Sequence, residues 1–159
     1  MTGEKKFYLT KEGLVKIEKE FNDLKILKLA KISGESPKIL HSEDLNQEYL
    51  SFQEDLSFIE SRLMELEHIF KNVELIKTPV KVKQNIIDLG ATVTLEQKDG
   101  SINEFTLVGS LEANPAVGKI SNESPVGKFL LGHKINDEII ITSPIKVLYK
   151  VKKIKYSLS

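Results

Sequence analysis

The chain has 159 residues, 40% hydrophobic and 29% charged, a length that suits one domain of ordinary size or two small ones. It contains no cysteine, which excludes disulfides, a thiol nucleophile and cysteine-ligated zinc or iron–sulfur clusters. No apolar run approaches the ~18 residues of a membrane span or marks a secretory signal, so we expect a cytoplasmic protein that does not contact a membrane.

Charge is unevenly divided along the chain, although the formal net charge is zero. Residues 1–76 hold 11 Lys+Arg and 15 Asp+Glu, whereas residues 77–159 hold 12 and 8. This asymmetry predicts two modules with different surfaces. It argues against a uniformly basic nucleic-acid binder, because binding driven by counterion release needs a basic surface. Any contact with a nucleic acid would have to be local.

The first predicted element is a helix that begins after Thr10, a residue type that caps helix N-termini. An apolar stripe at helical spacing follows, and Leu27 and Ala30 continue it less strictly. Its strict members are Leu14, Ile17, Phe21 and Leu24. Because residues 33–37 include a glycine and a proline, we expect the helix to end or kink there.

The strongest periodicity of the chain predicts a second helix over residues 45–73. Nine apolar residues recur there with alternating spacings of 4 and 3, the a/d pattern of a coiled-coil seam. They are Leu45, Tyr49, Phe52, Leu56, Ile59, Leu63, Leu66, Phe70 and Val73. Such a helix would be roughly 42 Å long. This length suits an arm in which the two helices form an antiparallel hairpin.

Pairing the two seams predicts the register of the hairpin. The expected partners are Leu14 with Val73, Ile17 with Phe70, Phe21 with Leu66 and Leu24 with Leu63. This register places the apex at Glu43 and Asp44. The first helix is rich in lysine and the second in acids, which predicts ion pairs between their solvated faces. The alternative interpretation is a polarised face for a partner.

Helical periodicity stops around Pro79, so we divide the chain into modules 1–76 and 77–159. The second module has the alternation and turns of short strands. The predicted strands are Ala91–Leu95, Ile102–Val108, Glu138–Thr142 and a last one marked by Val147, Tyr149 and Val151. Ser124 and Pro125 begin a short helix that Gly132 closes. The predicted fold class is α+β, an N-terminal antiparallel two-helix coiled coil followed by an antiparallel sheet with one short helix.

Three segments of the second module closely resemble the carboxy-terminal domain of the bacterial GreA/GreB transcript-cleavage factors. They are Gly90–Val93, Val108-Gly109 with Glu112-Ala113 and, as the most specific match, Ile120–Gly132. Leu9–Gly13 and the long seam are similar to the amino-terminal coiled coil of that family. The resemblance therefore covers nearly the whole chain, and it implies an FKBP-like fold for the second module.

The resemblance implies a transcription elongation factor that binds bacterial RNA polymerase at its secondary channel. In the family, the coiled coil enters the channel, and acids at its tip help to hold Mg²⁺ in the polymerase active site, since this hard cation prefers oxygen ligands. The polymerase then cleaves the backtracked nascent RNA. Such a factor is not itself an enzyme and has no cofactor of its own. We expect a monomer, and the family also carries an expectation of DNA binding.

Carried over to this sequence, the resemblance makes Glu43 and Asp44 the catalytic acids, which would bind Mg²⁺ only jointly with the polymerase. It also implies a polymerase-binding surface around the short helix. The residues of that surface are Ser124, Pro125, Gly127, Lys128 and Leu130.

The tip departs from the pattern of the family, which reads approximately Gly-Asp-Leu-x-Glu-Asn-Ala-Glu-Tyr. An alignment without a gap puts Ser42 and Leu45 at the two acid positions, and neither residue has a carboxylate. A two-residue deletion instead aligns Asp44 with the aspartate of the family, and Glu43 then substitutes for the missing glutamate. The alternative is that both acids merely start the second helix, where its dipole favours negative charge.

The sequence leaves two alternatives to transcript cleavage. A non-catalytic channel binder would modulate or inhibit the polymerase without stimulating cleavage, and the altered tip favours it. A prolyl isomerase would need an aromatic-lined apolar cleft. The second module has few aromatic residues and no tryptophan, which argues against that activity.

Overall fold

A computed structural model describes residues 5–34, 47–142 and 145–156, and the chain divides into two compact units. One unit is the helical hairpin, Leu14–Asn72. The other unit joins Met1–Gly13 to Val73–Ser159, so the first 13 residues group with the sheet rather than with the hairpin. Within the described residues, no helix combines the length and apolarity that a membrane crossing requires.

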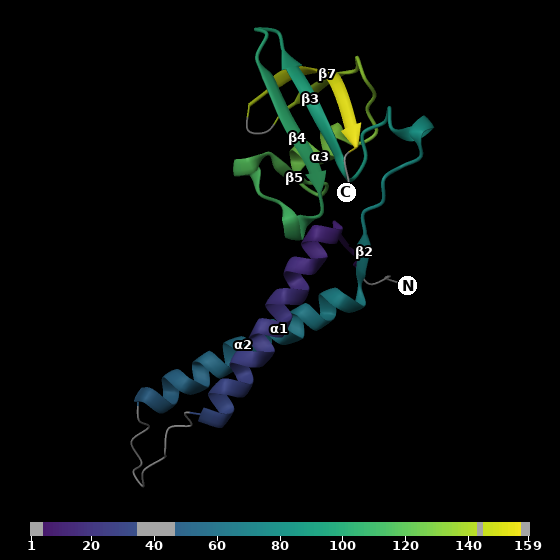
Figure 1. Cartoon of the computed structure of the whole chain (residues 1–159). Coiled ribbons are helices and arrows are strands. Elements are labelled where there is room, and N and C mark those ends of the chain that lie inside the picture. The colour runs from purple at the N-terminus through teal and green to yellow at the C-terminus, as the bar shows by residue number, and fades with distance from the viewer. Residues whose placement is uncertain (1–4, 35–46, 143–144, 157–159) are drawn as a thin grey trace. The chain divides into compact units, whose positions relative to one another are not determined.

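The hairpin unit contains two long helices, α1 (Lys11–Gly34) and α2 (Gln47–Lys71), which are labelled in Figure 1. They run antiparallel. The Phe21 ring meets the Phe70 ring edge-on, with centroids 5.3 Å apart, and near the other end Lys31 pairs with Asp55. The described part of α1 reaches Gly34, and the rest of the segment where its end was predicted lies outside the described residues. The predicted apex, Glu43 and Asp44, lies outside the described residues.

Burial confirms the heptad seam of α2 from Tyr49 to Leu66. At the end of the helix, Ile69 is buried beside the predicted Phe70, and the predicted Val73 lies beyond Lys71, the last residue of α2; Leu45 lies outside the described residues. Leu63 and Leu66 are buried, and the seam residues nearer the start of α2 are buried or half-buried. These are Tyr49, Phe52, Leu56 and Ile59. Phe21 contacts Phe70, one turn beyond its predicted partner Leu66, and the other predicted pairs stay predictions. The edge-to-face packing of two rings favours this contact beyond the area it buries.

The seam of α1 is apolar only in its first half. Its half-buried positions keep the heptad spacing, but the last two are Lys28 and Lys31, whereas the expected Leu27 and Ala30 are exposed. The heptad repeat keeps positions 28 and 31 facing α2 whatever their side chains, and apolar residues off that repeat turn outwards. The predicted ion pairs between the helices form here. Their N···O distances are 3.4 Å for Lys28–Glu60 and 2.9 Å for Lys31–Asp55. A third pair, Arg62–Glu20 at 2.6 Å, lies in the other half of α1 and has the opposite polarity to the predicted pairs, since its base belongs to α2.

The second unit contains a five-stranded sheet with the strand order β5-β4-β3-β7-β6 (Figure 1). The strands are β3 (Ala91–Gln97), β4 (Ile102–Val108), β5 (Lys119–Ser121), β6 (Glu138–Ile141) and β7 (Val147–Tyr156). The predicted α+β class and all four predicted strands are confirmed. The sheet is mixed, because β5 pairs parallel with β4. Three residues are too few to show a strand periodicity, so β5 escaped prediction.

One face of the sheet carries the core of this unit. Its strands contribute fully buried apolar side chains, and the short helix α3 (Pro125–Leu130) adds Leu130. The buried strand residues include Val93, Leu95, Leu107, Ile139, Ile141 and Val151. Three short 3₁₀ helices complete the unit, η1 (Lys81–Lys83), η2 (Ser110–Glu112) and η3 (Pro115–Val117).

A two-stranded sheet joins the two ends of the hairpin sequence. Strand β1 (Phe7–Leu9) pairs parallel with β2 (Val73–Leu75), and the N–H of Ile76 donates to the carbonyl of Leu9 at 2.8 Å. Leu9 is completely buried. The sequence did not predict this sheet, because each strand has three residues and its partner lies beyond two helices.

Replacement of Leu63 by aspartate tests the seam. Leu63 is 9% exposed, so Leu63→Asp buries a charge and should lower the free energy of unfolding by about 3 kcal/mol or more. The neighbouring Met64 is 71% exposed, and Met64→Asp should cost less than about 1 kcal/mol. Thermal unfolding followed by circular dichroism measures both variants, and equal losses would contradict the seam.

Candidate functional site

The two acids predicted to act in catalysis, Glu43 and Asp44, lie outside the described residues, so their role stays a prediction. Across residues 5–34, 47–142 and 145–156, no group of three or more acidic or histidine side chains is placed to hold a metal ion. The site residues that can be described are those around α3.

Ser124 caps the N-terminus of α3, as predicted. Its Oγ accepts a hydrogen bond from the N–H of Gly127 at 3.1 Å and donates one to the carbonyl of Ser121 at 2.6 Å. Pro125 takes the first helical position, where its missing N–H costs nothing. Gly132, just beyond the helix, has a φ of 85°, which fits its predicted closing role. The local sequence therefore determines both ends of this short helix.

Burial separates the five predicted partner-binding residues into two groups. Leu130 is completely buried in the core, and Gly127 is buried where a Cβ atom would overlap the carbonyl oxygen of Ser121. Because Gly127 and Leu130 are buried, they can support partner binding only by holding α3 in position. Pro125 and Lys128 are exposed, and Ser124 is half-buried. An exposed surface on this helix also includes Phe129, which the sequence analysis did not single out.

A polar cluster lies immediately before α3, and no pattern in the sequence predicted it. The hydroxyl of Ser110 donates to Glu123 at 2.8 Å, and the ammonium of Lys5 lies 3.2 Å from the same carboxylate oxygen. The Ser110 hydrogen bond and, next, Lys5 hold the pKa of Glu123 below its ordinary value. Glu123 therefore stays charged at neutral pH, and the stabilisation from this contact is lost only as the pH falls into the acidic range.

Two sequence motifs about a hundred residues apart meet at the start of α1. The backbone N–H and the hydroxyl of Thr10 donate to the two carboxylate oxygens of Glu112, at 2.8 and 2.6 Å. The same hydroxyl oxygen accepts from the N–H of Gly13 at 3.0 Å, which confirms the predicted cap. A Cβ atom on Gly13 would overlap the Glu112 carboxylate, and one on Gly109 would overlap the carbonyl of Tyr8. Both motifs were recognised in the sequence, but their contact was not.

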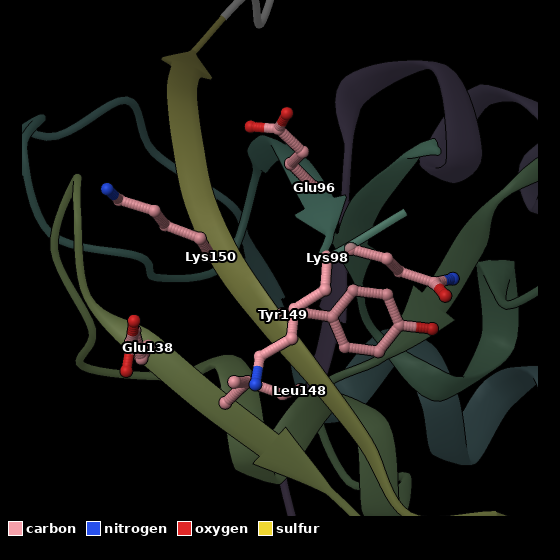
Figure 2. Close-up of a pocket in the computed structure, with 7 residues that line it drawn as sticks. Glu96, Lys98, Glu138, Leu148, Tyr149 and Lys150 are labelled. Atoms are coloured by element: carbon pink, nitrogen blue, oxygen red, sulfur yellow. The ribbon is translucent and has the colours of Figure 1, made fainter. Parts of the chain in front are cut away.

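A hollow of about 230 Å³ lies on the sheet beside β3, β6 and β7 (Figure 2). Its lining contains Glu96, Gln97, Lys98, Glu138, Leu148, Tyr149 and Lys150. Two acids and two lysines balance each other, and Lys150 is in register with both Glu96 and Glu138. With one aromatic side chain among its lining residues, this hollow does not provide the aromatic-lined cleft that a prolyl isomerase would need.

Comparison with known proteins gives two family matches that together cover most of the chain. The family "Transcription elongation factor, GreA/GreB, C-term" matches residues 82–156, and "Transcription elongation factor, N-terminal" matches residues 7–75.

Individual relatives match over most of their length. Transcription elongation factor GreA of Shouchella clausii is 43% identical over 148 residues, which are 91% of this chain and 92% of the relative. The GreA protein of Bacillus subtilis is 41% identical over 159 residues, 97% of this chain and 99% of its own. Among solved structures, GreA factor homolog 1 (Gfh1) of Thermus thermophilus aligns with a TM-score of 0.43 and 25% identity, over 95% of this chain and 99% of that protein.

Substitution of Ser124 tests its capping role. Ser124→Ala leaves the N–H of Gly127 without its acceptor and should lower the free energy of unfolding by about 1 kcal/mol. Ser124→Asp keeps an oxygen acceptor and should retain most of the stability. Denaturant unfolding curves of the wild type and both variants measure the difference. If aspartate is as damaging as alanine, the hydroxyl has a role other than the cap.

Proposed function

Because the chain belongs to the GreA/GreB family of transcription elongation factors, we propose that it binds bacterial RNA polymerase at the secondary channel and stimulates cleavage of backtracked nascent RNA. The observation that supports this proposal most is the family match on both halves of the chain, at about 40% identity to GreA proteins over nearly the full length. The factor is proposed to act in the cytoplasm, as a monomer, on a reaction that the polymerase itself catalyses.

The length of the hairpin helices supports this proposal. The helix α2 has 25 residues, which correspond to roughly 37 Å at 1.5 Å per residue. A buried apolar seam and ion pairs between the helices hold this length together. A helical pair of this length is suited to carrying a short acidic segment into a channel.

The proposed chemistry assigns Glu43 and Asp44 to the end of the hairpin. Two-metal phosphoryl chemistry needs carboxylate oxygens around a hard cation and a positioned water. In the proposal, these two acids complete the shell of a Mg²⁺ ion that the polymerase provides, so the chain needs no cofactor of its own.

The proposed polymerase-binding surface is the exposed side of α3. Pro125, Lys128 and Phe129 are exposed on this helix, and together they offer apolar contact area and one positive charge. The buried Gly127 and Leu130 hold the helix in place beneath them.

Removal of the two acids tests the catalytic part of the proposal. Glu43→Ala/Asp44→Ala should abolish stimulated RNA cleavage and leave polymerase affinity nearly unchanged, because the binding surface lies elsewhere. RNA length in a stalled, backtracked elongation complex gives the first readout, and competition binding gives the second. The matched control is Glu54→Ala/Glu67→Ala, which removes two exposed acids of α2 and should cleave like the wild type.

The single variants distinguish the two alignments of the tip. Loss confined to Asp44→Ala supports the alignment with the deletion, and equal loss from both supports a shared pair. If the wild type binds the backtracked complex but never shortens its RNA over a range of Mg²⁺ concentrations, the protein is the non-catalytic channel binder instead.

A charge reversal tests the binding surface. Lys128→Glu should weaken polymerase binding several-fold at low salt and lower the melting temperature only slightly, because the side chain is exposed and its attraction to Glu123 is that of a surface charge. Lys134→Glu, an equally exposed lysine of the same unit outside α3, serves as the control. Equal losses in the two variants would show that only net charge matters and would refute a role for this helix.

A further inference from the structure

The five-stranded sheet has a second face that does not carry the core. The helix α3 packs with the core on one face, so side chains that alternate with the buried residues point to the other. Strand register sorts these residues into rows, since directly paired residues share a face. The first row is Lys119–Thr106–Thr92–Lys155, the second is Glu104–Thr94–Lys153, and the third is Ile102–Glu96–Lys150–Glu138.

Charges in the third row are compensated. Lys150 is in register with an acid on each side, Glu96 and Glu138. The neighbouring Lys152 pairs with Glu96 at 2.7 Å. This end of the face is therefore occupied by ion pairs within the chain.

The first two rows carry an excess of positive charge. Within the described part of the chain, Lys119, Lys153 and Lys155 have no carboxylate within 4.0 Å of their ammonium groups. Lys153 and Lys155 are exposed, and Lys119 is half-buried. The one acid of these rows, Glu104, is separated from Lys153 by the intervening strand β3. These ammonium groups are thus available to an external anion.

Hydroxyl groups fill the space between the lysines. Thr92 and Thr106 form a hydrogen bond between their Oγ1 atoms at 3.0 Å, and Thr94 lies in the next row. In a hydroxyl pair, one group donates and the acceptor keeps its own proton for an outside partner. Hydroxyls between lysines are the donor set that proteins use for phosphate oxygens. We call these six residues, Lys119, Lys153, Lys155, Thr92, Thr94 and Thr106, the lysine–threonine face.

We infer that the lysine–threonine face binds the phosphate backbone of a nucleic-acid strand. Outward residues of one strand, such as Lys153 and Lys155, repeat at roughly 7 Å, so they offer a series of cations to a chain of phosphates rather than one site for a single anion. None of the three rows contains an aromatic side chain on which a base could stack, so binding is independent of sequence. This contact is local, and it is separate from the proposed polymerase surface on α3.

The test measures binding of the full chain to a labelled 20-nucleotide single-stranded RNA by fluorescence anisotropy, without polymerase. The wild type should bind at low salt, and the logarithm of its affinity should fall with that of the salt concentration with a slope of about −2, as expected for three phosphate contacts. The triple variant Lys119→Gln/Lys153→Gln/Lys155→Gln should lose most of this affinity and nearly all of the salt dependence. Its circular dichroism melt should match that of the wild type.

The matched control is Lys81→Gln/Lys83→Gln, which neutralises exposed lysines of η1 that do not belong to the sheet and should retain binding. Its counterpart is the double variant Lys153→Gln/Lys155→Gln, which removes two positive charges from the lysine–threonine face and should weaken RNA binding. The two double variants therefore remove the same charge from different places. The inference is overturned if the wild type shows no salt-sensitive RNA binding. It is also overturned if the triple variant binds RNA fully, which would point to the lysine-rich α1. Equal losses of RNA affinity in the two double variants, or displacement of the RNA by polyglutamate at equal charge concentration, would overturn it as well. Because no polymerase is present, these results do not depend on the outcome of the cleavage assay.

Discussion

The organisation of the chain depends on the pairing of strands β1 and β2, which come just before and just after the hairpin in the sequence. Parallel pairing of β1 with β2 places the residues before α1 beside the residues after α2. The carboxylate of Glu112 then fixes the start of α1 by accepting both hydrogen bonds from Thr10. Charge-assisted hydrogen bonds of this kind are stronger than neutral ones. Because Gly13 packs directly against that carboxylate, a larger residue there would force the two segments apart.

Beyond this junction, the hairpin is stabilised differently in its two halves. The buried Leu63 and Leu66 form an apolar seam with the half-buried Phe21, and full burial of a leucine side chain contributes about 1.5–3 kcal/mol. Farther along, the seam positions of α1 are lysines, and partly exposed ion pairs contribute only about 0–1 kcal/mol each. Stability is therefore concentrated in the half nearest the junction, and the half that leads to the proposed acidic tip is the more sensitive to salt.

The sheet unit supplies two surfaces of different character. On one side, α3 presents Pro125, Lys128 and Phe129 above a buried Leu130, so its exposed residues are supported by the core. On the other, the lysine–threonine face consists of residues from four strands that come together only through their register. The two proposed contact surfaces, α3 and the lysine–threonine face, share one hydrophobic core.

Local chemistry in the sequence was enough to predict the two long helices, the caps at Thr10 and Ser124, the four longer strands and the fold class. Heptad spacing, side-chain capping and alternation act over a few residues, so they can be recognised without knowledge of distant contacts. The three-residue strands β1, β2 and β5 carry no such period. Their existence depends on partners that only the folded chain brings close. The same reason applies to the bond between Thr10 and Glu112, and to the position of Leu130 in the core while Lys128 faces solvent. Tertiary structure also decided which lysines are paired, because Lys31 and Lys155 look alike in the sequence, and only packing places a carboxylate beside the first.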